Sequence, residues 1–166
     1  MLEFEPTNHG FVKEAEEEGS AKPGGRVVEF TGSGALNIGD AVLVSAADTV
    51  LKTVTATNHK NRLGIVVGGK RTNMKVLSGS DALGLAAAAD GEQVLVQIDG
   101  IAWGVADTAT VAVGDKLKLG TTTAGRLLDG ADTTDAVAGI TGSILAQALT
   151  ASAAAGDAIK VIIDRG

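Results

Sequence analysis

The sequence contains no cysteine, no tyrosine and only two prolines, and aromatic side chains make up 2% of its 166 residues. Without cysteine, the chain can form neither a disulfide framework nor a cysteine–histidine zinc site. No apolar run approaches the roughly 20 residues that a membrane-spanning helix requires. Because large aromatic side chains usually supply much of a core, their scarcity predicts a thin core of small residues. Such a domain can gain stability from neighbours in an assembly.

The chain also has fewer basic than acidic residues: 14 Lys and Arg against 20 Asp and Glu, which gives a formal net charge of −6. This balance argues against nucleic acid as the main partner, because phosphate binding needs clustered cations. The first residues are acidic and lack the basic-then-apolar pattern of a secretory signal. We therefore expect a chain that is made in a cytoplasm and binds neither nucleic acid nor membrane.

Side chains that could carry chemistry are few and scattered. His9 and His59 stand in polar contexts, and neither has a carboxylate or second histidine at metal-ligand spacing. The glycines of 31–39 do not give a dinucleotide fingerprint, and a strand pattern follows them where that motif needs a helix. Acid–base or nucleophilic catalysis would depend on Asp, Glu, Lys or Ser alone. The sequence predicts no catalytic residue, no metal and no cofactor, and hence no enzyme.

From Arg26 onward, short alternating or β-branched runs are separated by Gly, Asp, Asn, Ser and Thr, which is typical of β-strands and turns. The predicted strands are 26–30, 41–44, 63–67, 92–98, 116–119 and 158–163. Two segments rich in Ala and Leu, 80–91 and 143–156, favour a short helix each. The chain is therefore predicted to be all-β with minor α: a small β-barrel or β-sandwich-like domain.

One phrase, a glycine and an acid followed by an alternating strand, recurs along the chain. It occurs as "IGDAVLVS" (38–45), "DGEQVLVQ" (90–97), "VGDKLKLG" (113–120) and "AGDAIKVI" (155–162). Glycine permits the positive φ of a tight turn, and the acid can hydrogen-bond the backbone just beyond it. The alternating residues then present one face to a core. The phrase predicts four strand starts and no chemistry.

The recurrence indicates an internal duplication. A shift of 75 residues places Gly39-Asp40 on Gly114-Asp115, and a shift of 65 places 86–99 on 151–164. Self-similarity at such a spacing is a signal about the fold. It predicts pseudo-repeats at about 35–99 and 110–164. Because no linker-like composition separates them, we expect the copies to be two halves of one barrel in a single domain, 26–166.

Residues 1–25 differ from the rest, since six glutamates and two lysines give this segment a charge of −4. We interpret it as an extended acidic arm that docks on a partner, with Phe4 and Phe11 as its anchors. A plain disordered tail is the alternative.

A basic stretch follows later in the chain, because 49–80 holds six cations and no acid. Its cations are Lys52, Lys60, Arg62, Lys70, Arg71 and Lys75. The stretch is either a solvated basic loop or a docking surface for an acidic arm or partner, with Lys70, Arg71 and Lys75 as the binding residues. Trp103, the only tryptophan, is either a core or barrel-end residue or a subunit contact, since tryptophan is enriched in interfaces.

The order of these elements resembles the small capsid decoration, or cement, proteins of tailed bacteriophages. The similarity covers roughly 35–164. Its most telling segments are "GEQVLVQIDGIAWGVA", the following "VGDKLKL" and the late "AGITGSILAQALTASAAAGDAIKVII".

This resemblance implies a compact β-barrel-like subunit that forms homo-oligomers, with a trimer favoured over a dimer. Such a subunit would sit on the exterior of the virion capsid, bind the major capsid protein and stabilise the head after its synthesis in the host cytoplasm. The family has no reaction and no cofactor. The acidic arm is longer than the family pattern requires, which leaves open whether arm or barrel makes the main capsid contact.

Two other functions compete with this one. Biotinyl and lipoyl carrier modules are also duplicated small β structures, and "NMKV" offers Lys75 as a modification site, although it does not lie midway between matching halves. An extracellular β-rich adhesin or surface-layer protein is the other alternative, against which the lack of a signal pattern weighs.

Overall fold

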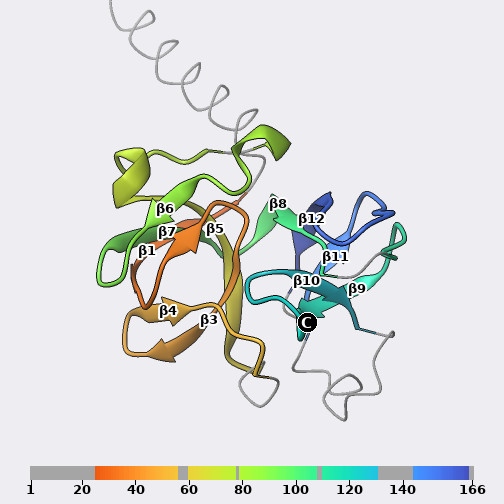
Figure 1. Cartoon of the computed structure of the whole chain (residues 1–166), viewed down its shortest axis with the longest axis horizontal. Helices are drawn as coiled ribbons and strands as arrows, with labels where there is room; N and C mark the ends of the chain where they lie inside the picture. Colours follow the sequence, from red (N-terminus) through yellow and green to blue (C-terminus); the bar gives the residue numbers. More distant parts are fainter. Residues whose placement is uncertain (1–24, 56–59, 78, 108–109, 131–143, 165–166) are drawn as a thin grey trace, which may run out of the picture.

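The computed structural model describes residues 25–55, 60–77, 79–107, 110–130 and 144–164, and these form twelve β-strands and two short 3-10 turns (Figure 1). The prediction of an all-β chain is confirmed. The strands divide into two groups that follow the sequence, and in Figure 1 the orange-to-green group lies beside the teal-to-blue group.

The first group is a closed barrel with the strand order β1-β4-β3-β5-β7. Its bounds are β1 Val27–Gly32, β3 Ala41–Ala46, β4 Thr49–Leu51, β5 Arg62–Gly69 and β7 Gln93–Gln97. The barrel closes because β1 pairs in parallel with β4 and antiparallel with β7. Two shorter strands, β2 (Leu36–Asn37) and β6 (Ala86–Ala88), pair with each other, and the 3-10 turns η2 (Lys70–Thr72) and η3 (Ser80–Ala82) precede β6.

The second group is a five-stranded sheet with the order β10-β9-β11-β12-β8. Its bounds are β8 Gly100–Val105, β9 Lys116–Leu119, β10 Leu127–Asp129, β11 Ile144–Ala148 and β12 Ala158–Ile163. Its outer strands approach each other as well, because Ala106, just after β8, forms a parallel bridge with Leu127 of β10.

The two groups repeat one topology. In chain order, β1, β3, β4, β5 and β7 correspond to β8, β9, β10, β11 and β12, and each antiparallel pair of the first group has an antiparallel counterpart in the second. The parallel closure also recurs, as β1 with β4 and as the Ala106–Leu127 bridge. Even the β2–β6 pair, Leu36 with Ala88, has a counterpart in the bridge between Val111 and Ser152. The internal duplication is thus visible in the hydrogen-bonding pattern.

The structure differs from the expectation that the copies would share one barrel. Each copy forms its own five-stranded unit, because each begins with a strand outside the predicted repeats: β1 before 35 and β8 before 110. Each of these strands pairs with the last strand of its own copy, so hydrogen bonding closes within the copies.

The predicted helices are also wrong. Segment 143–156 contains strand β11, and segment 80–91 contains η3 and strand β6. The Ala and Leu content of both segments favours a helix. β11, however, pairs with β9 on one side and β12 on the other, and this tertiary pairing outweighs local propensity.

The repeated glycine–acid phrase forms the same turn four times. In each turn the acid accepts a hydrogen bond from the backbone N–H three residues earlier, not from the backbone beyond it as expected. Its own N–H donates to the carbonyl of that same residue. The glycines have φ of 92°, 78°, 94° and 91°, the left-handed region that favours glycine. The turns are those of Asp40, Glu92, Asp115 and Asp157. They begin β3, β7, β9 and β12, as the sequence predicts.

The two copies share part of their core. One buried cluster fills the first barrel, and the other fills the second sheet. The second cluster also contains Ala41, Leu43 and Ile65, which alternate on β3 and β5 with side chains that face into the barrel. The backbone N–H of Ala41 donates to the carbonyl of Gly125 across the junction, with 2.7 Å between N and O. The copies therefore pack as one body.

Candidate partner-binding surface

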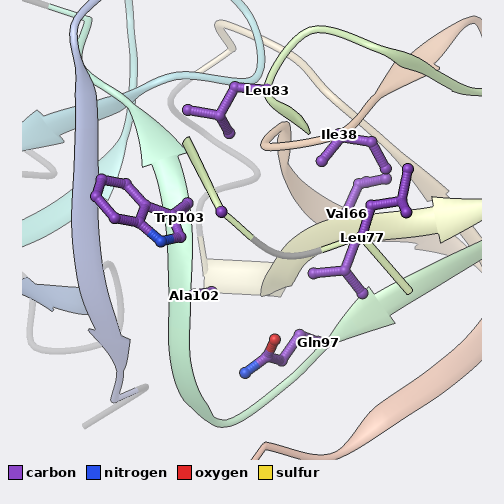
Figure 2. A pocket seen from close by; sticks show the side chains of 9 residues that line it. Ile38, Val66, Leu77, Leu83, Gln97, Ala102 and Trp103 are labelled. Carbon is purple, nitrogen blue, oxygen red and sulfur yellow. The ribbon is translucent and has the colours of Figure 1, made fainter. Parts of the chain in front are cut away.

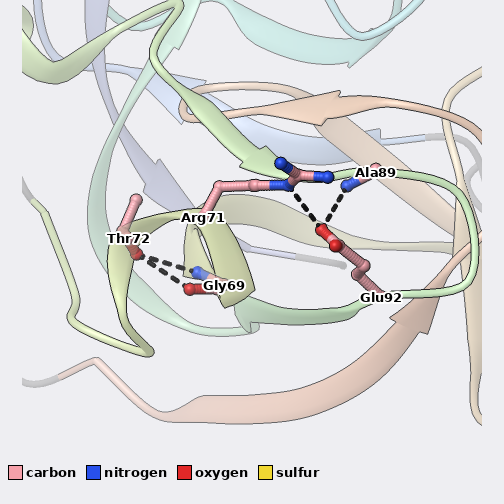
Figure 3. Close-up of polar contacts among 5 residues, drawn as sticks. All are labelled: Gly69, Arg71, Thr72, Ala89 and Glu92. Atoms are coloured by element: carbon pink, nitrogen blue, oxygen red, sulfur yellow. Dashed lines mark hydrogen bonds and ion pairs between the residues drawn. The ribbon is translucent and has the colours of Figure 1, made fainter.

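The predicted cationic surface lies on the turn that follows β5. Lys70 and Arg71 belong to η2, Lys75 follows it, and all three are exposed. The hydroxyl of Thr72 accepts the N–H of Gly69 at 3.0 Å and lies 3.1 Å from the carbonyl oxygen of the same residue (Figure 3). It also lies 2.8 Å from the carbonyl oxygen of Lys75. These bonds hold the turn in one shape and therefore fix where the three cations emerge.

Arg71 ties this turn to the turn before β7. Its Nε lies 2.8 Å from Oε2 of Glu92, and the same oxygen accepts the N–H of Ala89 at 2.9 Å (Figure 3). No hydrogen bond or ion pair joins the ammonium groups of Lys70 and Lys75 to another residue that the structure describes. Of the three predicted binding residues, the two lysines therefore keep their donors for a partner, whereas Arg71 also has a structural contact.

The rest of the basic stretch is partly neutralised by the fold. Lys52 donates to Oδ2 of Asp40 at 2.8 Å, and Nε of Arg62 donates to the carbonyl oxygen of Ile144 in the other copy. The solvated-loop interpretation therefore does not fit these two cations. The docking role of Lys70, Arg71 and Lys75 stays a prediction.

Glu92 gives stability a pH dependence that can be tested. The N–H of Ala89 and then Arg71 lower the pKa of Glu92 below its ordinary value. A carboxyl with a lowered folded pKa adds stability above its unfolded pKa and loses it as the pH falls through the folded pKa. We expect Glu92→Gln to flatten the loss of stability between neutral and acidic pH, measured by urea unfolding. Glu29→Gln, an exposed change on β1, is the control, and identical slopes for the wild type and Glu92→Gln would contradict this role.

Trp103 was predicted to be either a core or barrel-end residue or a subunit contact, and the structure shows it neither fully buried nor fully exposed. It lies half-buried on β8 and lines a small pocket of about 10 Å³, which has room for one water at most (Figure 2). Residues of both copies line this pocket: Ile38, Val66, Leu77, Leu83 and Gln97 from the first, and Ala102 from the second. In Figure 2, the indole ring lies to one side of β8, away from Val66, Leu77 and Gln97. Across the sheet, Trp103 pairs with Lys160, and the neighbouring Ile101 pairs with Ile162, which is exposed. Trp103 thus belongs to the junction between the copies, while part of its surface stays accessible.

Phe4 and Phe11, the predicted anchors, lie with most of the arm outside the described residues.

A cleft at the junction of the copies was not predicted from the sequence. It has a volume of about 220 Å³. Its charged walls come from Asp40 and Lys52 of the first copy and Arg126 of the second. Burial raises the pKa of Asp40 above its ordinary value, although hydrogen bonds from Lys52 and Asn37 oppose the shift. The repeated phrase contains Asp40 and the basic stretch contains Lys52, but no motif indicates that they lie beside Arg126, since the three come together only through the fold.

Among the described residues, no group of three His, Asp or Glu side chains is placed to hold a metal ion. In the same residues, no helix is long and apolar enough to cross a membrane.

Comparisons with known proteins add one structural similarity. No family model matches the chain, and no curated protein matches it. Among solved structures, the head fiber gp8.5 N base of bacteriophage phi29 is similar, with 14% identity and a TM-score of 0.46, over 85% of this chain and 97% of that one. Because this TM-score lies below 0.5, we infer neither function nor partner from the similarity.

Proposed function

We propose that the chain is a structural virion protein that binds the outer surface of an assembled tailed-phage capsid and stabilises it by bridging major capsid protein subunits. The observation that carries the proposal is the sequence resemblance to capsid decoration proteins over roughly 35–164. In the fold, the segments with this resemblance supply β7, β8, β9, β11 and β12, together with three of the four repeated turns.

The structure agrees with a protein that functions through its surface. The duplicated unit carries turns at its strand starts and ends, and the turn that contains η2 exposes Lys70 and, just after it, Lys75. Opposite charges on the two partners steer association and set its register. A protein that binds only the assembled shell stabilises that shell by mass action, even where each copy binds weakly.

The same proposal covers assembly and location. The subunits form a homo-oligomer, preferably a trimer, whose symmetry repeats one interface around an axis. They are made in the host cytoplasm and bind the capsid exterior, without catalysis and without a cofactor.

Co-sedimentation with expanded, undecorated capsid shells tests this function. We expect saturable binding at a fixed ratio to capsid subunits and a higher melting temperature of the shell. The double variant Lys70→Gln, Lys75→Gln should bind roughly tenfold more weakly at low salt, a difference that high salt reduces, because salt screens exposed charges. The control Arg26→Gln, Lys116→Gln removes the same charge at exposed positions elsewhere and should bind normally.

Absence of pelleting at every salt concentration would reject the capsid assignment and favour the adhesin and carrier alternatives. If binding occurs, deletion of residues 1–25 in the same assay separates the arm from the barrel as the main contact.

A further inference from the structure

The cleft between the two copies has fixed walls. On the side of the second copy, the buried carboxylate of Asp107 accepts the N–H groups of Thr122 and Thr123, each at 2.9 Å, and so holds the loop that leads to Arg126. On the opposite side, Asp40 accepts the N–H of Asn37 at 2.8 Å in the turn that begins β3. The cleft is therefore built before any ligand arrives, which lowers the cost of binding.

Glycine at position 125 keeps the cleft open. Its φ is 86°, and a Cβ there would lie 2.6 Å from Oδ1 of Asp40 and 3.0 Å from Cδ of Lys52. Any larger residue would displace the charged side chains that line the cleft. The backbone carbonyl of Gly125 meanwhile accepts the hydrogen bond from Ala41 that joins the copies.

Positive charge exceeds negative charge in the cleft. Lys52 and Arg126 bring two cations, and Asp40 brings one carboxylate, which is bound to Lys52. The guanidinium of Arg126 makes no hydrogen bond or ion pair with any residue in the described part of the chain, although its charge acts on Asp40. The side chains of Lys52 and Asp40 are only 28% and 15% exposed, so these charges act in a partly dehydrated space.

Apolar side chains form part of the remaining walls, beside Asn37, Thr123 and Gly84. Ile38, Val105 and Ala124 line the cleft together with the charged groups. A bare phosphate would leave these surfaces uncovered, whereas a carboxylate on a short aliphatic stem would use both kinds of wall. Guanidinium and carboxylate form bidentate pairs, and the ammonium of Lys52 has further N–H donors to offer.

We propose that this cleft binds a carboxylate carried on a short aliphatic stem, with Arg126 as its main partner and Lys52 as its second donor. The carboxylate comes either from an acidic side chain of a protein partner or from a free small acid. The inference concerns the isolated chain and holds or fails independently of the capsid assignment.

Amide NMR titrations of the full chain with N-acetyl-L-glutamate methylamide test the proposal. We expect saturable shifts at Asp40, Gly125 and Arg126, with a dissociation constant on the order of millimolar for so small a probe. The neutral N-acetyl-L-glutamine methylamide should cause none of them. Butyrate separates the two sources: tighter binding of the glutamate derivative indicates a peptide side chain, and tighter binding of butyrate indicates a free acid.

Three variants connect the binding to these residues. Arg126→Gln should weaken it roughly ten- to hundredfold, the usual effect of losing a charge-assisted pair. Asp40→Asn should tighten it severalfold, because the competing carboxylate is removed. Lys116→Gln, which removes the same charge at an exposed position on β9 outside the cleft, should leave it unchanged.

Dispersion of the amide signals shows whether each variant is folded. If Arg126→Gln does not fold, Arg126→Lys takes its place, because it keeps the charge but loses the bidentate geometry. The proposal is overturned if the glutamate probe gives no saturable shift, if the glutamine probe binds equally well, or if only inorganic phosphate binds. Unchanged affinity in the folded Arg126 variant also overturns it.

Discussion

Gly64→Ala is expected to lower the free energy of unfolding by about 3 kcal/mol or more. Gly64 lies in β5 between β3 and β7, where it pairs with Val42. A Cβ on this residue would overlap the carbonyl oxygen of Gln97 and lie 3.0 Å from Cγ1 of Val96. Because the nearest atoms belong to the backbone, β5 and β7 must separate to admit a methyl group. Urea unfolding followed by far-UV circular dichroism measures the loss.

Gly34→Ala is the control for this substitution. Gly34 has a φ of 80°, but no heavy atom lies within 4 Å of the position of its Cβ. The control therefore carries only the cost of a left-handed backbone, about 1–2 kcal/mol. Failure of Gly64→Ala to fold, while Gly34→Ala folds, agrees with the prediction. Equal losses for the two variants would contradict the proposed overlap.

The sequence predicts strands best where alternation is clean and a turn marks the start. The strands 116–119 and 158–163 appear with the predicted bounds, because each follows a glycine–acid turn. In 158–163 burial alternates as the pattern predicts, whereas in 116–119 Lys118 is buried together with its two leucine neighbours. β2, β4, β6 and β10 have two or three residues each, which is too short for a period to show. β11 was missed because its pairing with two neighbours, which composition does not reveal, decides its conformation.

The separate closure of each copy depends on contacts between distant residues. In β1, Val27 pairs with Gln97, and in β8, Gly100 pairs with Ile163. The two opening strands, "VVEFTG" and "GIAWGV", have little sequence in common. The sequence therefore revealed the repeat only in the glycine–acid turns and the strands that follow these turns. It did not reveal that each copy closes into its own five-stranded unit.

Contacts between distant residues also explain what the sequence missed around the predicted partner surface. Composition identified Lys70, Arg71 and Lys75 as an acid-free cluster, and the fold exposes all three. It did not identify Glu92, because this acid reaches Arg71 from a separate turn. Nor does anything in the sequence around Arg126 indicate that it faces Asp40, since the junction between the copies creates that proximity.

Ile65→Ala is expected to destabilise both copies together, by about 2–5 kcal/mol. Ile65 belongs to β5 of the first barrel, yet it is fully buried in the cluster that fills the second sheet. Its truncation leaves a cavity at the junction. Far-UV circular dichroism reports on all strands and the fluorescence of Trp103 reports on the second copy, so the two urea transitions should move to lower urea by the same amount.

Ile162→Ala is the matched control, since the same side chain on β12 is 37% exposed. Its loss should stay near 0.5 kcal/mol, as for a surface change. If Ile65→Ala shifted the circular dichroism transition but not the Trp103 fluorescence transition, the two copies would unfold separately. Coincident shifts would instead show that the junction couples them. The cleft of Asp40, Lys52 and Arg126 would then lie within the cooperative unit, because it is formed at the same junction.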